Sequence, residues 1–245
     1  MYPEPIPLEI VHEDEQIVVL LKPSGMLVHP TIGVKTGTLA NALAYHLNKR
    51  MIEEGEWPDP RSSTPNSQRS VRPGLVHRLD RATSGLMVIA KTPRSLTTLS
   101  RHFRRRLVEK RYVALVWGDV ELDAGTIDAP IGRDPDGRPR WRVMEGGKGS
   151  ETRFRVLERR RAATLLELEP VTGRTNQLRI HCARIGHPIV GDGLYCESPI
   201  TGCGMRLCLH ASRLAFHHPA TGEWLEFTSP LPDGIVAVAG RLAGK

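Results

Sequence analysis

Short apolar runs separated by turn residues recur along the chain, and this pattern predicts more strands than helices. The runs at 17–21 and 86–90 are continuously apolar and stop at Lys22-Pro23-Ser24-Gly25 and Lys91-Thr92-Pro93, as buried strands do. Further strands are expected near 9–15 and at 112–117, 152–157, 163–168 and 224–227, with a turn at Asp134–Gly137. Many strands with few helices favour an α+β fold with a large, mainly antiparallel sheet.

Three segments have the apolar spacing of a helix. The first is capped by Thr36 or Thr38 and carries Leu39, Ala42, Leu43, His46 and Leu47 on one face. The second has Thr92 as its cap and Pro93 in its first turn, and its apolar stripe is Leu96, Leu99, Phe103 and Leu107. The third is capped by Thr175 and carries Leu178, Cys182 and Ile185 before Gly186.

Residues 49–70 differ from the rest because they are charged, contain prolines and are rich in Ser and Asn. Such a composition cannot bury a core, so we expect a mobile insertion there. The apolar content of the whole chain, 40% over 245 residues, suffices for the core of one large domain or two small ones. We expect a single domain over residues 1–245, with its core at about 9–230.

The composition also bears on the compartment. No apolar run has the length of a membrane span, and the first residues do not resemble a signal peptide. The four cysteines lack the short spacing of a zinc site, and disulfide frameworks belong mainly to small secreted domains. We therefore expect reduced thiols in a cytoplasmic protein. We also expect the protein to be a monomer.

Charge is distributed unevenly along the sequence. Residues 1–59 contain 4 basic and 9 acidic residues, a net charge of −5, so the total of +7 leaves +12 for residues 60–245. This asymmetry suggests a polyanionic partner such as RNA. Arginines gather at 101, 104, 105 and 106, where they suit either phosphate contacts or the C-terminal end of a helix.

Asp80 lies between Arg78 and Arg81, just before a Thr-Ser-Gly turn and the strand at 86–90. Nearby positive charge keeps a carboxylate ionised, and an ionised carboxylate on a turn can act as a nucleophile or a base. A surface cluster of ion pairs is the alternative for such a charged stretch.

The stretch His77-Arg78-Leu79-Asp80-x-x-Thr83-Ser84-Gly85-Leu86 resembles the catalytic motif of the RluA-type pseudouridine synthases. The protein-kinase catalytic loop fits worse, because it has His-Arg-Asp without the intervening Leu. Gly173-Arg174-Thr175-Asn176-Gln177-Leu178-Arg179 resembles a second motif of the same family, with Asn176 where the family usually has His. Lys22-Pro23-Ser24-Gly25, 187–192 and 209–214 extend the resemblance over about residues 9–230.

This resemblance implies an enzyme that isomerises specific uridines in structured ribosomal or transfer RNA, without a cofactor. It implies the family's bent sheet with flanking helices and a central active-site cleft. The catalytic residues would be Asp80, Tyr112, which stacks on the uracil, and Arg179, which pairs with Asp80. Arg78 would fill the space that the flipped base leaves, and the further substrate-binding residues would be His77, Arg81, Thr83, Arg174, Asn176, Gln177, Leu209 and His210.

Features of the sequence suit three function classes: a pseudouridine synthase, an RNA-binding protein without activity, and a glycoside hydrolase. A glycoside hydrolase usually needs two carboxylates at a fixed separation, and the sequence has no second acidic residue in a motif comparable to that of Asp80. The histidines have no acidic or Cys partners at metal-ligand spacing, so we expect no metal. The RNA-binding S4 domain common in the RluA-type family is expected to be absent from the N-terminal side.

Overall fold

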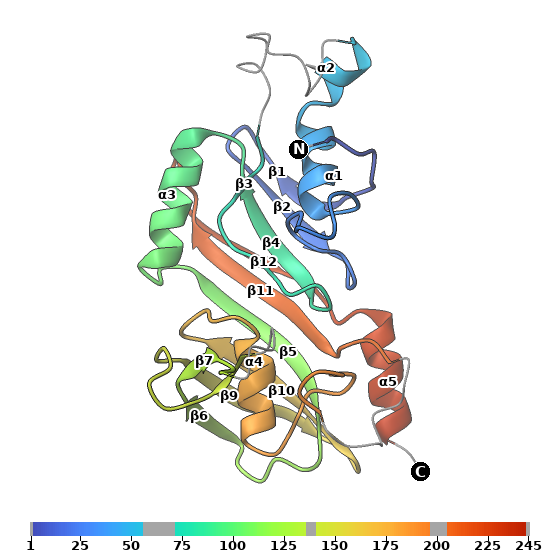
Figure 1. Ribbon diagram of the computed structural model, residues 1–245, viewed down its shortest axis with the longest axis vertical. Coiled ribbons are helices and arrows are strands. Elements are labelled where there is room, and N and C mark those ends of the chain that lie inside the picture. Colours follow the sequence, from blue (N-terminus) through green and yellow to red (C-terminus); the bar gives the residue numbers. More distant parts are fainter. Residues whose placement is uncertain (1, 56–71, 136–140, 197–204, 244–245) are drawn as a thin grey trace. The chain divides into compact units, whose positions relative to one another are not determined.

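The computed structural model describes residues 2–55, 72–135, 141–196 and 205–243. The chain divides into two compact units that each combine strands and helices (Figure 1). The first unit is Met1–Val108 with Phe216–Leu225, and the second is Glu109–Ala215 with Glu226–Lys245. The first unit therefore takes one segment from near the C-terminal end of the sequence.

Strand β4 (Ser84–Ala90) forms the centre of the first unit. It pairs antiparallel with β2 (Ile17–Lys22) and with the short β3 (Gly74–Leu75), while β1 (Glu9–Glu13) pairs with the other edge of β2. All seven residues of β4 are buried, which explains the continuously apolar sequence. The strands predicted at 17–21 and 86–90 are confirmed.

The helices of the first unit are α1 (Leu39–Leu47), α2 (Lys49–Glu53) and α3 (Pro93–Arg104). Thr38 caps α1 through a capping box with Asn41, and Thr92 caps α3, as two of the sequence patterns predicted. The insertion predicted at 49–70 begins with α2, a short helix that ion pairs one turn apart support. Residues 56–70 of that insertion lie outside the described residues.

The end of α3 departs from the predicted amphipathic pattern. Leu99 is fully buried, but Leu96 and Leu107 are exposed, so the apolar stripe is shorter than predicted. Arg106 follows the helix with a φ of 60°. The amide of the next residue, Leu107, donates to the carbonyl of His102 at 3.0 Å, which completes a helix-ending motif that usually has glycine in this position.

The second unit is built on the strand order β11-β5-β10-β9-β6, with every pairing antiparallel. These strands are β5 (Glu109–Trp117), β6 (Ala124–Asp128), β9 (Glu151–Arg159), β10 (Ala163–Pro170) and β11 (Leu209–His217), and β12 (Trp224–Thr228) also pairs with β11. A separate pair joins β7 (Ile131–Arg133) to β8 (Trp141–Val143). It flanks the predicted Asp134–Gly137 turn, whose last two residues are outside the described residues.

Two helices complete the second unit, and α4 packs on β8, β9 and β10 while α5 packs on β10 (Figure 1). The cap of α4 (Gln177–Arg184) is Asn176 in a left-handed conformation (φ 54°), so the prediction of Thr175 was wrong. Asn tolerates this conformation better than a β-branched residue. The helix α5 (Asp233–Ala243) was not predicted. Its buried residues Ile235, Val238 and Ala239 have a helical spacing that could have revealed it.

None of the helices in the described parts of the chain is long and apolar enough to cross a membrane.

Candidate active site

Asp80 lies on a tight turn that leads directly into the buried strand β4. The backbone carbonyl of Asp80 accepts a hydrogen bond of 3.1 Å from the amide of Thr83, which closes the turn. Gly85, the second residue of β4, has a φ of 123°, a conformation that favours glycine. The Asp80 side chain is half-buried. A rigid strand therefore fixes the backbone that carries the predicted catalytic carboxylate.

A buried lysine holds the residue after Asp80. Lys22, at the end of β2, is 1% exposed, and its Nζ donates to the carbonyls of Pro23 (2.7 Å), Met26 (3.0 Å) and Arg81 (3.3 Å). A buried ammonium is costly unless it is hydrogen-bonded, and these carbonyls supply acceptors. Lys22 thus ties its own turn to the Asp80 turn.

The Lys22–Gly25 turn makes further bonds to the same segment. Gly25 donates its amide to the Arg81 carbonyl (2.8 Å) and accepts a bond of 2.9 Å from the Arg81 Nε. Gly25 has a φ of 88°, so the turn needs a glycine here. The Ser24 hydroxyl donates to the Ala82 carbonyl at 2.6 Å. The carbonyls of three successive residues, 80 to 82, are therefore all held.

His77 is also built into this part of the first unit. Its Nε2 accepts a bond of 3.1 Å from the amide of Val88, so the ring proton belongs on Nδ1. Its ring stacks on that of Phe103 from α3, with centroids 4.6 Å apart and planes inclined by 18°. One nitrogen and one face of His77 are therefore used inside the protein.

In the second unit, Arg179 on α4 forms a two-pronged ion pair with Asp192. Its Nε and Nη2 each lie 2.7 Å from a carboxylate oxygen of Asp192, whose side chain is fully buried. The amides of Leu194 and Tyr195 also donate to Asp192 Oδ1, at 2.9 and 3.1 Å. These bonds fix the guanidinium in one orientation.

Asn176 and Tyr195 complete the surroundings of Arg179. The Asn176 amide accepts from Arg179 Nη1 at 3.3 Å and donates to the Tyr195 hydroxyl at 3.1 Å. The guanidinium carbon lies 5.1 Å from the centroid of the Tyr195 ring, within reach of a cation–π interaction. Burial raises the pKa of Tyr195, although the bond from Asn176 opposes this. Tyr195 therefore acts as a neutral phenol beside the arginine.

Comparison with known proteins finds a family and several relatives that are similar to this chain. Residues 16–184 match the model of the RNA pseudouridylate synthase family. The chain belongs to this family.

Two curated relatives are similar over most of the chain. "Ribosomal large subunit pseudouridine synthase D" of Nitrosomonas europaea is 41% identical over 96% of this chain, which spans 65% of that relative's length. An uncharacterised RNA pseudouridine synthase of Bacillus subtilis is 40% identical over 98% of this chain and 74% of its own. The solved structure of human RNA pseudouridylate synthase domain containing 4 has a TM-score of 0.74 at 26% identity, and the match covers 96% of this chain and 92% of that chain.

These relatives confirm the RluA-type resemblance and the α+β fold class. Within this chain, His77, Arg78, Asp80, Arg81 and Thr83 all belong to the turn of the first unit. Tyr112, Arg174, Asn176, Gln177, Arg179, Leu209 and His210 all belong to the second unit. The meeting of Asp80 with Tyr112 and Arg179 stays a prediction from the resemblance.

Two of the predicted substrate-binding residues, Gln177 and Arg174, form hydrogen bonds within the second unit. The buried Gln177 accepts from the Thr172 hydroxyl and the Arg174 amide, and donates to the Glu151 carbonyl and the Thr152 hydroxyl, at 2.7 to 3.0 Å. All of its amide's capacity is thus used to hold the turn before α4. The guanidinium of Arg174 is exposed and points two nitrogens at the Gly149 carbonyl, both at 3.3 Å.

Tyr112 is half-buried on β5, opposite Ala211 of β11. The neighbouring β11 residues Leu209 and His210 are 3% and 2% exposed, and His210 Nε2 lies 3.0 Å from the Ser229 hydroxyl. The adjacent strands therefore place these three predicted residues near one another. The burial of Leu209 and His210 favours a packing role over direct contact with RNA.

Arg78 is exposed at the start of the Asp80 turn. Burial, and secondly the charge of Arg78, lower the pKa of His29, which places the guanidinium near the loop before α1. Sequence reasoning missed the roles of Lys22, Asp192 and Tyr195, although the first two stand in quoted motifs. In the described residues, no group of three or more His, Cys, Asp or Glu side chains is arranged to hold a metal ion.

Proposed function

We propose that this chain converts uridine to pseudouridine in large-subunit ribosomal RNA, with Asp80 as the essential carboxylate. The observation that carries the proposal is the clamped turn, in which the carbonyls of residues 80 to 82 are all hydrogen-bonded. A carboxylate on such a fixed backbone is preorganised for chemistry. The name of the Nitrosomonas relative supports ribosomal RNA as the substrate, and we place the reaction in the cytoplasm.

The reaction rearranges the nucleoside without oxidation. The N1–C1′ bond breaks, the detached uracil turns, and C5 joins C1′. The proton on C5 is lost to a base while N1 gains a proton, so the product has the composition of the substrate and no cofactor is required. Asp80 either attacks the nucleoside or deprotonates the sugar, and both roles need its ionised form.

The other roles follow the family resemblance. Tyr112 stacks on the uracil and takes the C5 proton, and Arg179 orients Asp80. A base in a folded RNA must first leave its stack, at a cost of a few kcal/mol. Arg78 fills the space that the base vacates, which agrees with its exposed position next to the turn.

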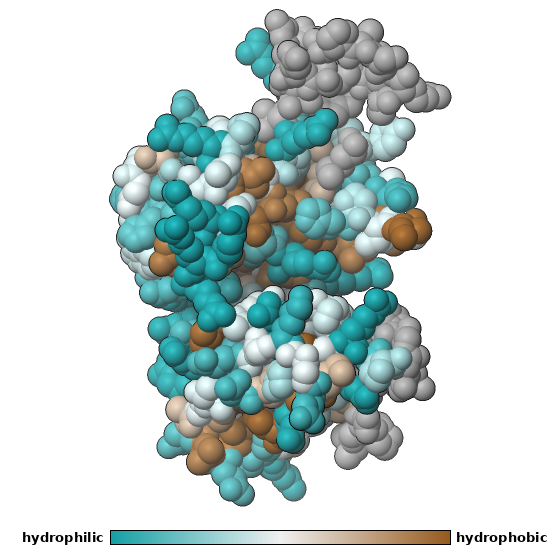
Figure 2. Space-filling model, turned by 60° about the vertical axis from the view of Figure 1, so that its left-hand side comes forward, coloured by the Kyte–Doolittle hydropathy of each residue, from teal (hydrophilic) through white to brown (hydrophobic). Residues whose placement is uncertain are grey.

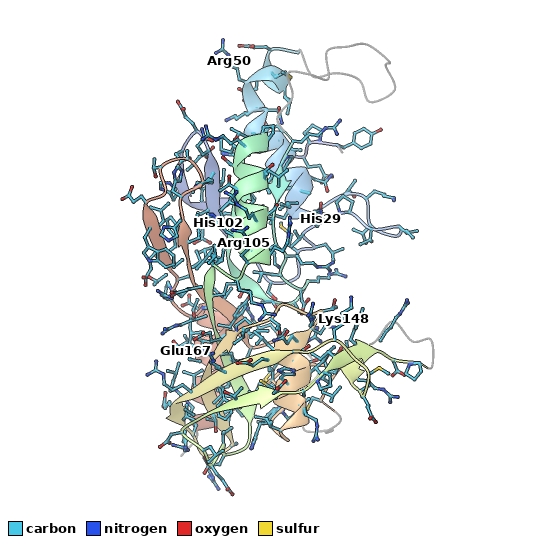
Figure 3. The ribbon with its side chains drawn as sticks, turned by 90° about the vertical axis from the view of Figure 1, so that its left-hand side faces the viewer. His29, Arg50, His102, Arg105, Lys148 and Glu167 are labelled. Carbon is cyan, nitrogen blue, oxygen red and sulfur yellow. The ribbon has the colours of Figure 1, made fainter. Side chains whose placement is uncertain are left out.

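The exposed arginines at the end of α3 are the proposed contact for RNA phosphates. Hydrophilic side chains gather over this end of the helix in Figure 2, and Figure 3 shows His102 and Arg105 projecting there. The residues are Arg101, Arg104, Arg105 and Arg106, all exposed. Arginines on β9 are different, because Arg153 and Arg155 form ion pairs with glutamates. The α3 cluster therefore suits phosphate better.

Tritium release from ribosomal RNA labelled with 5-³H-uridine tests this function, with labelled transfer RNA as the alternative substrate. The wild-type protein should release tritium and leave the RNA chain intact, whereas Asp80→Asn should bind RNA but release none. Asp123→Asn, which changes an exposed carboxylate of the second unit, is the matched control and should keep full activity. Release of free uracil would indicate a hydrolase, and binding without any release would indicate an RNA-binding protein.

A further inference from the structure

The loop between β2 and α1 carries the most exposed large apolar side chain in the described parts of the chain. Ile32 is 97% exposed, whereas the next value among large apolar residues is 66%, for Leu122. Val34, two positions after Ile32, is also exposed. A side chain that buries almost none of its surface adds almost nothing to packing, so the fold gives no reason for isoleucine at this position.

Hydrogen bonds fix the loop that presents Ile32. At its base, two backbone bonds of 2.8 and 3.0 Å join residues 27–28 to residues 39–40. At its tip, the Thr31 amide donates to the Val34 carbonyl (2.7 Å), and the Thr31 hydroxyl accepts from the Val34 amide (3.2 Å). Ile32 therefore lies on a closed turn, and little conformational freedom is lost when a partner covers it.

The base of this loop is attached to the turn that carries Asp80. Lys22 Nζ donates to the carbonyls of both Met26 and Arg81, so these two carbonyls lie close together. Met26 is followed directly by the residues that close the base of the loop. The loop therefore starts beside the candidate active site, within the same unit.

His29, which Figure 3 labels, places the outer part of the loop beside the same turn. Burial and, secondly, the charge of Arg78 lower the pKa of His29, so these two side chains are neighbours. Three residues span at most about 11 Å, and Ile32 is three residues from His29. Ile32 is therefore within reach of an RNA that lies over the Asp80 turn.

The surroundings of Ile32 favour nucleic acid as its partner. Residues 23–37 contain no Asp or Glu, and Arg78 and Arg81 are exposed on the adjoining turn. Proteins that deform nucleic acids combine cations for the phosphates with apolar wedges, isoleucine among them, that enter between bases. A protein interface or a bilayer would need a much larger apolar surface than Ile32 and Val34 provide.

We propose that Ile32 packs against the base next to the uridine that leaves its stack. This inference rests on the proposed function. When a base flips, the face of the neighbouring base loses its stacking partner, which makes the flipped state unfavourable. An apolar side chain that covers this face replaces part of the lost contact and stabilises the flipped state. Ile32 thus assists base flipping and takes no part in the chemical step.

The test measures single-turnover tritium release, at saturating RNA, from a fragment of ribosomal RNA that contains the uridine modified by the wild type. Ile32→Ala and Ile32→Asn should lower the rate by about fivefold or more, because neither covers a base as isoleucine does. Ile32→Leu keeps an apolar side chain of the same size and should stay within about twofold of the wild type. All three variants should melt within about 1 °C of the wild type, since the side chain is exposed.

Leu122→Ala is the matched control, because it shortens an exposed apolar side chain of the second unit. It should leave the melting temperature, the RNA affinity and the rate unchanged. Neither Leu122→Ala nor Ile32→Ala removes a charge, so both should keep the wild-type slope of log affinity against log salt.

A second series of substrates locates the contact. The RNA fragment is prepared with a nucleotide that lacks its base, on either the 5′ or the 3′ side of the uridine. On one of these two RNAs, the ratio of the wild-type rate to the Ile32→Ala rate should fall below about twofold, because the base that Ile32 covers is gone. On the other RNA, the ratio should stay at about fivefold.

Four outcomes would overturn the inference. A wild-type rate in Ile32→Ala would show that the side chain is idle, and a clearly lower melting temperature would show that it supports the fold. A rate in Ile32→Asn as high as in Ile32→Leu would exclude an apolar contact. An unchanged ratio on both altered RNAs would exclude contact with a neighbouring base. Failure of the wild type to release tritium from any RNA would instead refute the proposed function, and this inference with it.

Discussion

The guanidinium of Arg179 is bound by the carboxylate of Asp192 through two contacts of 2.7 Å within the second unit. The third nitrogen, Nη1, donates to the side-chain oxygen of Asn176, so all three guanidinium nitrogens have partners within this unit. A buried partner already balances the charge of Arg179. If Arg179 orients Asp80 as proposed, it would do so mainly by fixing the direction of the carboxylate and less by neutralising its charge. The reason is that Asp192 holds the guanidinium in one orientation before RNA binds.

This pair gives the first prediction. Arg179→Met leaves the Asp192 carboxylate buried without its counter-charge, so the free energy of unfolding should fall by about 3 kcal/mol or more. The double variant Arg179→Met/Asp192→Asn should recover much of that stability in urea unfolding, yet remain inactive in single-turnover tritium release. If the double variant regains the wild-type rate, Arg179 serves only to neutralise Asp192.

The second prediction concerns Lys22. Lys22→Met removes the lysine donor from the Pro23 and Met26 carbonyls and one of the two donors of the Arg81 carbonyl, which should cost about 1 to 3 kcal/mol of stability. The rate should fall more than RNA affinity does, because the Asp80 turn loses its anchor. Lys35→Met changes an exposed lysine of the same unit and should be neutral in both assays. Equal losses of rate and of affinity would argue that Lys22 supports the fold as a whole.

The third prediction concerns the arginines at the end of α3. The double variant Arg104→Ala/Arg105→Ala should weaken RNA binding and reduce the slope of log affinity against log salt by about one unit for each lost phosphate contact. Arg153→Ala/Arg155→Ala removes two arginines that are paired with glutamates, and should leave the slope unchanged. Filter binding between low and moderate salt measures both. An unchanged slope in the first variant would assign these arginines to the helix end alone.

The fourth prediction is a pH dependence of stability. Burial, together with the charge of Arg206, lowers the pKa of His210 to about 4. The unfolded chain takes up this proton near pH 6.5, whereas the folded chain resists it, so stability is complete above pH 6.5 and declines as pH falls toward 4. The shift corresponds to a loss of about 3 kcal/mol across this window.

Urea unfolding at pH 7 and pH 4.5 measures this loss. His210→Gln, which stays neutral, should flatten the dependence, whereas His217→Gln changes an exposed histidine and should not. The buried His181, whose pKa burial also lowers, should account for part of the remaining slope. A steep dependence that survives in His210→Gln would contradict the assignment.

Local patterns predicted the elements whose signals are local. The apolar runs of β2 and β4 and the caps Thr38 and Thr92 all appear as expected, because burial and capping depend on adjacent residues. Asn176 was missed as a cap because its left-handed backbone is stabilised by contacts with Arg179 and Tyr195. That information lies in the tertiary structure.

The candidate site shows the same division. Asp80 and its turn could be found from one motif, since the chemistry is concentrated in consecutive residues. The partners of the motif could not, because Lys22 reaches Arg81 across 59 positions and Asp192 reaches Arg179 across 13. A charged residue's sequence neighbours do not reveal which distant carbonyl or guanidinium it will meet.

The late segment Phe216–Leu225 of the first unit sets an order of events during synthesis. His218 in that segment lies 3.2 Å from the carboxylate of Asp14, near the opposite end of the sequence. A ribosome must therefore translate the entire second stretch, Glu109–Ala215, before the first unit has all of its residues. The first unit therefore cannot complete its folding while the second stretch is still being synthesised, as an N-terminal domain made of one continuous segment can. The unit that carries the Asp80 turn is begun first and completed almost last.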